Sequence, residues 1–203
     1  MKEYYLLLDS SNTSLTVGLA KKGFVVDSIS YEAWQSQSEH LIPEINNILD
    51  KNKVGKDDIN GVLVAVGPGS YTGVRISLTI AKVIGVALGV DIFPVSSLQI
   101  LKCGKKPSIC LENARSNRSY IGVYENEKCI LTDCILTNDE VKDYILNHPD
   151  FVVCGDTKYL GIDGYKANLS VEMVSLLKYL KPSPDSRAIK PVYLKDWLWI
   201  FSL

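Results

Sequence analysis

The sequence predicts an α/β protein built from two lobes of the same topology, with the element order β-β-β-α-β-α in each lobe. Its 203 residues, 46% hydrophobic and 22% charged, have ordinary globular composition and suffice for one large domain or two small lobes. Short apolar runs and helical repeats follow the same order twice along the chain, with a break near residues 103–108. We therefore expect an N-terminal lobe of residues 1–103 and a shortened C-terminal lobe of residues 108–203.

The first half of the chain contains a three-stranded meander followed by helix, strand and helix. An apolar run that ends at Asp9 predicts the first strand, and the polar turn after it predicts the first bend. Ser38 is the candidate N-cap of the first helix, Gly89 is a fitting stop for the second, and Ser96 or Ser97 could cap a short third helix. The predicted strands are 3–10, 15–20, 24–30, 57–66 and 90–97, and the predicted helices are 38–50, 73–88 and 98–103.

The second half repeats this order. Thr137 and Glu140 have the spacing of a capping box at the start of a helix. The order is that of a duplicated ribonuclease-H-like unit, the architecture of the actin, sugar kinase and Hsp70 superfamily. The tail 192–203 is strongly apolar at its end, and we expect it to pack back on the body. The predicted strands are 107–112, 119–126, 128–136 and 150–156, and the predicted helices are 137–148 and 170–181.

Composition excludes several classes of function. The formal net charge is −1, which argues against nucleic-acid binding by this chain alone, because such binding needs clustered Lys and Arg. No apolar run reaches about 18 residues, so we expect no membrane association. The five cysteines contain no CxxC pair and are typical of reduced packing residues. The sequence therefore predicts a soluble, cytoplasmic protein.

The most unusual stretch is VAVGPGSYTGVR, residues 64–75. Five residues separate Gly67 from Gly73 and Val74 follows, so neither the Walker spacing nor the dinucleotide-binding spacing is present. A loop at a helix start can still hold an anion through free N–H groups. A tight corner that sets the entry of the helix explains the glycines equally well. An anion or nucleotide site here would use Asp9, Ser11, Gly69 and Ser70.

The helix predicted after this loop has more apolar surface than one sheet needs. It carries two apolar stripes at helical spacing, whereas a helix that covers one face of a sheet requires a single stripe. The second contact could be with the neighbouring helix 38–50 or with another protein chain. One stripe consists of Val74, Leu78, Ala81 and Gly85, and the other of Ile76, Ile80, Val83 and Ala87.

The same segments resemble the TsaB (YeaZ) family. The resemblance is carried by GPGSYTGVR, by the opening LLLDSSNTSLTVGLA, by SEHLIPEI and by the late PVYLKD, and it covers most of residues 4–101. It is thinner from 110 to 190, where Asn113 stands in place of an acidic residue of the family's DAR segment.

The resemblance implies a non-catalytic scaffold or activator that pairs with a TsaD-like subunit. That partner carries the metal and transfers threonylcarbamoyl to adenosine 37 of tRNAs that read codons beginning with A, and a TsaE-like ATPase joins the assembly. It further implies that tRNA is met only through the complex, that ATP and metal belong to the partner subunits, and that the pairing surface forms a homodimer when the partner is absent. The residues expected at this surface are His40, Leu41, Ile45, Val74, Leu78, Ala81, Lys82 and Gly85.

The residues themselves favour a chain without catalytic or metal-binding residues. In the catalytic paralogue two histidines at i and i+4 share a metal, and alignment places Ser97 and Leu101 at those positions. The alternatives are an ATP-binding, kinase-like enzyme that would use Asp9, and a self-associating protein with a different partner. A peptidase would need a base near Ser70, and neither of the two histidines is close to it in sequence.

Overall fold

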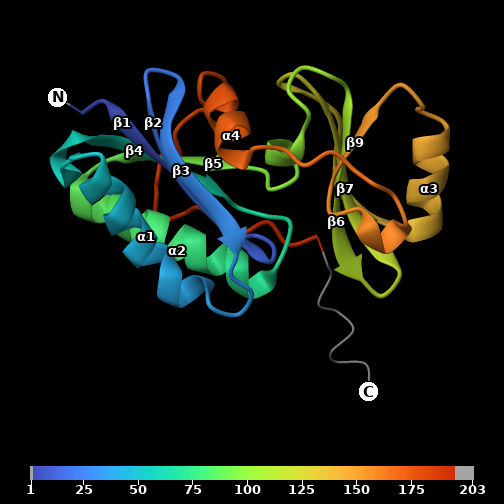
Figure 1. Ribbon diagram of the computed structural model, residues 1–203, viewed down its shortest axis with the longest axis horizontal. Coiled ribbons are helices and arrows are strands. Elements are labelled where there is room, and N and C mark those ends of the chain that lie inside the picture. The colour runs from blue at the N-terminus through green and yellow to red at the C-terminus, as the bar shows by residue number, and fades with distance from the viewer. Residues whose placement is uncertain (1, 195–203) are drawn as a thin grey trace.

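The computed structural model describes residues 2–194, which form two lobes lying side by side (Figure 1). The sequence predicts that the tail 192–203 packs back on the body, and the part of this tail beyond Leu194 lies outside the described residues. The first lobe contains β1 (Tyr4–Asp9), β2 (Ser14–Lys21), β3 (Phe24–Glu32), α1 (Gln37–Lys51), β4 (Ile59–Ala65), α2 (Tyr71–Leu88) and β5 (Asp91–Val95). After these come β6 (Ser108–Arg115), β7 (Arg118–Glu125), β8 (Lys128–Thr137), α3 (Asn138–Leu146), β9 (Val152–Gly155) and α4 (Leu169–Leu177).

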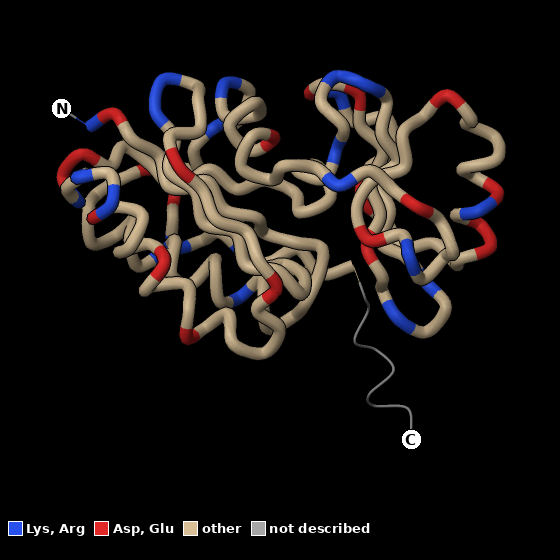
Figure 2. Tube along the Cα trace, viewed as in Figure 1, with Lys and Arg blue, Asp and Glu red and all other residues tan. Residues whose placement is uncertain are grey.

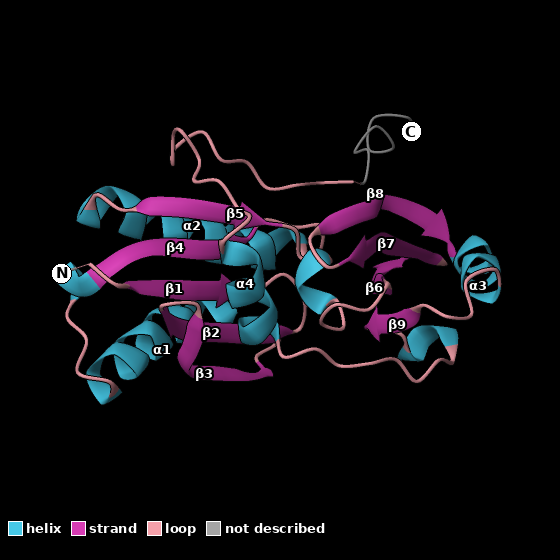
Figure 3. Ribbon diagram, turned by 90° about the horizontal axis from the view of Figure 1, so that it is seen from above, coloured by secondary structure: helices cyan, strands magenta, loops and turns pink. Residues whose placement is uncertain are grey.

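The second sheet repeats the order of the first four strands of the first sheet, which has β5 in addition. The first has the strand order β3-β2-β1-β4-β5, which is visible from above in Figure 3, and the second has the order β8-β7-β6-β9. In each, the three meander strands are antiparallel and the next strand adds in parallel to the first one. The predicted duplicated ribonuclease-H-like fold is therefore confirmed.

Side-chain alternation along β1 divides the first lobe into two core layers. Leu6 and Leu8 point to the face covered by α1 and α2, whereas Leu7 points to the opposite face, where Met173 of α4 packs. Figure 1 shows this arrangement, with α1 and α2 on one side of the sheet and α4 on the other. The last helix of the second half thus covers the sheet of the first half.

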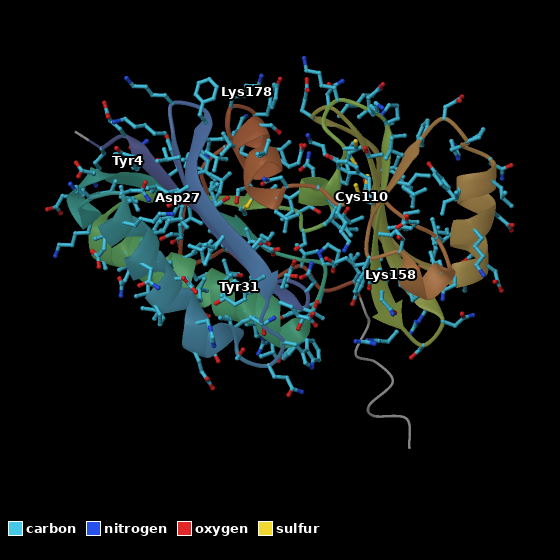
Figure 4. The ribbon with its side chains drawn as sticks, viewed as in Figure 1. Tyr4, Asp27, Tyr31, Cys110, Lys158 and Lys178 are labelled. Carbon is cyan, nitrogen blue, oxygen red and sulfur yellow. The ribbon has the colours of Figure 1, made fainter. Side chains whose placement is uncertain are left out.

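The second sheet also buries both of its faces. Val141 of α3 packs against one face, and Leu98 and Leu101, from the segment after β5, pack against the other. Cys110 of β6 and Cys154 of β9 are paired in register within this second layer (Cys110 is labelled in Figure 4), and all five cysteines are free thiols. Residues of both charge signs are spread over the two lobes (Figure 2).

Several local predictions can be compared with the structure. Thr137 and Glu140 form the predicted capping box, and Ser96 caps the turn after β5 by accepting hydrogen bonds from the N–H groups of Leu98 and Gln99. Ser38 as N-cap was wrong, because α1 begins two residues earlier and Ser36 holds that position.

The predicted helix 98–103 is only a 3-10 turn, Gln99–Leu101. It ends at Lys102, where ψ changes to 158° and the backbone becomes extended.

The segment 178–194 returns to the first lobe and runs beside α2. Its backbone hydrogen bonds join Ser183 N–H to the carbonyl of Ile92 at 2.8 Å and Val192 N–H to the carbonyl of Val66 at 2.7 Å. Together with α4, this segment links the second half of the chain to the first sheet. The division of the chain near residues 103–108 stays a prediction.

Candidate functional site

The predicted pairing surface lies on α1 and α2. The residues exposed on these helices are mostly not those that the sequence placed at the surface. Most of the residues that the sequence placed at this surface are buried in the core of the monomer, because they lie on the sides of α1 and α2 that pack on the sheet. They are Leu41, Ile45, Val74, Leu78, Ala81 and Gly85.

The second apolar stripe of α2 faces outward in part, because Ile76 and Ile80 pack against the core and Val83 and Ala87 do not. Val83 is 62% exposed, Val86 beside the stripe is 53% exposed, and Ile42 of α1 is 53% exposed. Ala87 is exposed as well, and Ile76 and Ile80 are half-buried. Below we call Ile42, Val83, Val86 and Ala87 the outer apolar patch. The predicted pairing surface stays a prediction, and the residues that could form it are those of the outer apolar patch.

The two polar residues predicted at the interface differ in their surroundings. His40 is exposed, and its Nδ1 is hydrogen-bonded to the hydroxyl of Tyr31 at 2.9 Å (Tyr31 is labelled on β3 in Figure 4). Lys82 is half-buried, and its Nζ donates to the carbonyl oxygen of Arg187 at 3.0 Å. Lys82 thus binds the returning segment of its own chain.

By length and composition alone, α2 could also cross a membrane. It is 18 residues long, and one-third of them are buried inside the protein. Among the buried residues, Leu78 and Ala81 belong to the core cluster that packs on the first sheet. Four further apolar residues, Ile76, Ile80, Ile84 and Leu88, are half-buried and pack against the same core, so most of the apolar composition of α2 serves packing within the lobe.

The glycine loop forms a corner packed against the hairpin between β1 and β2. A Cβ atom on Gly69 would lie 2.3 Å from the carbonyl oxygen of Ser11, and one on Gly73 would lie 1.9 Å from that of Ser10. Two N–H groups that an anion would need are already used: Ser70 N–H donates to the Ser11 carbonyl at 2.6 Å, and Gly73 N–H donates to the Ser70 side chain at 3.2 Å. The close approach explains both glycines.

The four residues of the predicted anion site do lie together, at one end of a cleft of about 780 Å³ between the lobes. Ser11, Gly69 and Ser70 line this cleft, and Asp9 lies behind Ser11, whose N–H donates to Asp9 Oδ1 at 2.9 Å. Burial raises the pKa of the Asp9 carboxyl. Across the cleft, Glu112 Oε1 accepts a 3.2 Å hydrogen bond from the Asn12 amide. These buried carboxyl groups make the end of the cleft unfavourable for an anion.

The positions that align with metal-binding histidines serve the packing of the fold here. Ser97 Oγ accepts a 3.0 Å hydrogen bond from Gly67 N–H, and Leu101 is buried in the core between the lobes. Within residues 2–194, no three His, Cys, Asp or Glu side chains are placed so that they could hold a metal ion.

Sequence reasoning missed a cluster that joins the glycine loop to the returning segment. The Arg75 guanidinium lies 3.9 Å from the centroid of the Tyr71 ring and donates to the Tyr193 hydroxyl at 2.6 Å, and the two tyrosine rings stack with centroids 5.1 Å apart. The signal for it was present in two separate segments, GPGSYTGVR and PVYLKD, which both carry the family resemblance.

Comparison with known families and relatives defines the class of the protein. Residues 29–147, well over half of the chain, match the model of TsaD, tRNA N6-adenosine threonylcarbamoyltransferase. The chain is 30% identical over 134 residues to the Bacillus subtilis "tRNA threonylcarbamoyladenosine biosynthesis protein TsaB", an alignment that covers 64% of this chain and 58% of that protein. It is 29% identical over 154 residues to the protein of the same name from Buchnera aphidicola subsp. Schizaphis graminum, covering 70% and 73%. The chain thus spans less than two-thirds of the Bacillus relative.

A solved structure agrees with this class at the level of the fold. YeaZ from Pseudomonas aeruginosa superimposes with a TM-score of 0.77 at 21% identity, covering 95% of this chain and 100% of that one. The chain therefore belongs to the TsaB (YeaZ) family, within the wider family that the threonylcarbamoyltransferase model describes.

Proposed function

We propose that this protein is a non-catalytic scaffold or activator that pairs with a TsaD-like subunit in the threonylcarbamoylation of adenosine 37 of tRNAs reading codons beginning with A. Membership of the TsaB family and the names of the two relatives support a role in making threonylcarbamoyladenosine. The proposed site of action is the cytoplasm, where the tRNA substrate is modified.

The observation that carries the pairing role is the outer apolar patch. Val83, Val86 and Ile42 come from two neighbouring helices and expose half or more of their surface. Apolar side chains exposed on neighbouring helices are typical of protein interfaces. α2 already packs against the sheet, against α1 and beside the returning segment, so these exposed side chains are the apolar surface that the two helices leave for a partner.

In this proposal the partner subunits supply the chemistry. This chain has only two histidines, so it cannot provide the histidine pair at helical spacing on which the catalytic paralogue relies. The metal and ATP then belong to the TsaD-like and TsaE-like subunits, and tRNA is reached through the complex.

Two alternatives make different predictions. A self-associating protein would use the same outer patch to form a homodimer and would not stimulate tRNA modification. A kinase-like enzyme would bind magnesium and ATP through Asp9. Asp9 is only 1% exposed, which makes it a poor ligand for a hydrated metal–phosphate complex.

The test reconstitutes tRNA modification from purified TsaD-like and TsaE-like subunits and a source of threonylcarbamoyl-adenylate, with and without this chain. We expect modified adenosine to rise strongly when the chain is added, and a stable complex with the TsaD-like subunit to elute in size-exclusion chromatography. The absence of any stimulation would overturn the proposal, and ATP binding that Asp9→Ala abolishes would favour the kinase-like alternative.

A matched pair of variants locates the surface. Val83→Asp adds a charge to the outer patch, and we expect it to abolish pairing and stimulation. Val171→Asp adds the same charge at a valine that is 49% exposed on α4, away from the patch, and should leave both intact. If both variants are folded by circular dichroism and pair and stimulate to the same extent, the interface does not include the outer apolar patch.

A further inference from the structure

The cleft between the lobes has the size and the walls of a small-molecule site. Its volume of about 780 Å³ lies in the range of ligand pockets. The β1–β2 hairpin and the loop before α2 form one wall, and the ends of β6 and β9 form the other.

Buried polar atoms without partners lie at the inner end of this cleft. Ser11, 1% exposed, lines it, and the Ser11 hydroxyl makes no hydrogen bond to any residue of the range 2–194. Asp9 Oδ2 is also buried and has no hydrogen-bond partner within residues 2–194. Glu112 is 5% exposed and receives one hydrogen bond, on Oε1 from Asn12, which leaves Oε2 free within the described chain. Since buried polar groups are normally paired, this end of the cleft offers hydrogen-bond acceptors to a ligand.

The charges around these atoms define the kind of ligand. Burial raises the pKa of Glu112 well above its ordinary value, and the nearby carboxylates of Asp9 and Asp156 raise it further. A positively charged ligand group at this end would stabilise the ionised form of Glu112 against burial and against the charges of Asp9 and Asp156. A phosphate or carboxylate group would instead be repelled by these charges. The titratable groups that act on or near Glu112 from the surrounding elements are Asp9, Tyr120, Asp133, Asp156 and Tyr159.

The outer part of the cleft can hold the body of such a ligand. Trp34 lines it and is 49% exposed, so its ring is available for contact with an alkyl chain or a cation. The cleft is also lined by two basic residues, Arg115 and Lys158 (labelled on the second lobe in Figure 4), and by two acidic ones, Asp156 and Asp163. The rim therefore has no single charge sign, and the inner acceptors determine selectivity.

We propose that the interlobe cleft binds a small organic molecule through a protonated amino group, which donates hydrogen bonds to Glu112 and to the hydroxyl of Ser11. An ammonium group has three donors and no acceptor, which complements this set of acceptors. The inference concerns a site distinct from the outer apolar patch and does not depend on the proposed pairing function.

The test is isothermal titration calorimetry of the full chain with 1,4-diaminobutane, spermidine and L-lysine. The comparison ligands are 1,4-butanediol, which has the length of the diamine without its charge, then AMP and Mg²⁺ alone. We expect saturable binding of at least one amine, no binding of the diol, and release of protons on binding, measured as a dependence of the heat on the buffer's ionisation enthalpy. Absence of amine binding up to 10 mM, or equal or tighter binding of the diol, AMP or Mg²⁺, would overturn the proposal.

Variants separate the site from general effects on the fold. Glu112→Gln should weaken amine binding by about tenfold or more and abolish the proton release, as loss of a charge-assisted hydrogen bond implies. Asp163→Asn removes a carboxylate from the rim of the same cleft and should change the affinity less than about twofold. Ser11→Ala removes the second acceptor and tests the site independently if Glu112→Gln fails to fold. Unchanged amine binding in either inner variant would contradict the assignment.

Discussion

Arg75 and Tyr193, which are 118 positions apart in the sequence, are joined by a 2.6 Å hydrogen bond from Arg75 Nε to the tyrosine hydroxyl. Tyr193 also stacks on Tyr71, so one side chain from the returning segment contacts the first turn of α2 in two ways. The backbone bond from Val192 to Val66 lies next to this cluster. The position of the glycine loop therefore depends on a segment from the far end of the chain.

The first prediction concerns this link. Tyr193→Ala removes the stacked ring and the acceptor, and we expect it to lower the free energy of unfolding by about 1–2 kcal/mol. It should also expose the segment 183–194 to limited proteolysis. Tyr193→Phe keeps the ring and should have a smaller effect on both measurements. Equal protease sensitivity of the wild type and Tyr193→Ala would show that this contact does not hold the segment.

The second prediction concerns the close packing of the glycine loop on the hairpin. A Cβ atom at Gly73 would overlap the Ser10 carbonyl at 1.9 Å, so Gly73→Ala should lower the free energy of unfolding by about 3 kcal/mol or more. Gly55→Ala is the control, because Gly55 has φ of −76° and only an ordinary contact at 3.4 Å. We expect the control to change stability by less than about 1 kcal/mol in urea denaturation. A well-folded Gly73→Ala protein of wild-type stability would contradict this account of the corner.

These contacts show how much of the fold could be predicted from the sequence. The strands and helices follow from local periodicity, and the capping box at Thr137 is recognisable from four residues. The packing of α4 on the first sheet could not be predicted, because Met173 and Val174 would suit the core of either lobe.

For a similar reason, the sequence could not show which stripe of α2 faces outward. Both stripes of α2 are apolar, and hydrophobicity alone cannot say which of them lies on the sheet. The small residues of the Val74–Gly85 stripe allow close approach: a Cβ at Gly85 would lie 2.9 Å from Ile92 of β5. Residue size was the signal that distinguished the buried stripe from the outer one.

The third prediction concerns a buried ion pair between the linker after β5 and α4. Lys102 is 3% exposed, and its Nζ donates to Glu172 Oε2 and to the Gly104 carbonyl. Glu172→Ala leaves the ammonium group buried without its counter-charge and should lower the free energy of unfolding by about 3–5 kcal/mol.

The double variant tests the pairing itself. Lys102→Met combined with Glu172→Ala removes the stranded charge, so we expect it to be more stable than Glu172→Ala alone. Urea denaturation of the two single variants and the double variant gives the coupling energy. Strictly additive losses would mean that the pair contributes through packing only.

The fourth prediction follows from the buried carboxyl of Glu112, whose pKa lies well above its ordinary value of 4.5 because of burial and the charge of Asp9. Between these two pKa values the folded protein binds more protons at this site than the unfolded chain does, so stability falls as the pH rises through that window and levels off above it. Glu112→Gln cannot ionise, and its stability relative to the wild type should therefore increase from pH 5 to pH 8. Glu127→Gln, which changes an exposed carboxyl, is the control for loss of a charge. Urea denaturation at both pH values measures the difference, and a constant offset between the wild type and Glu112→Gln would mean that Glu112 ionises in the folded protein as readily as in the unfolded chain.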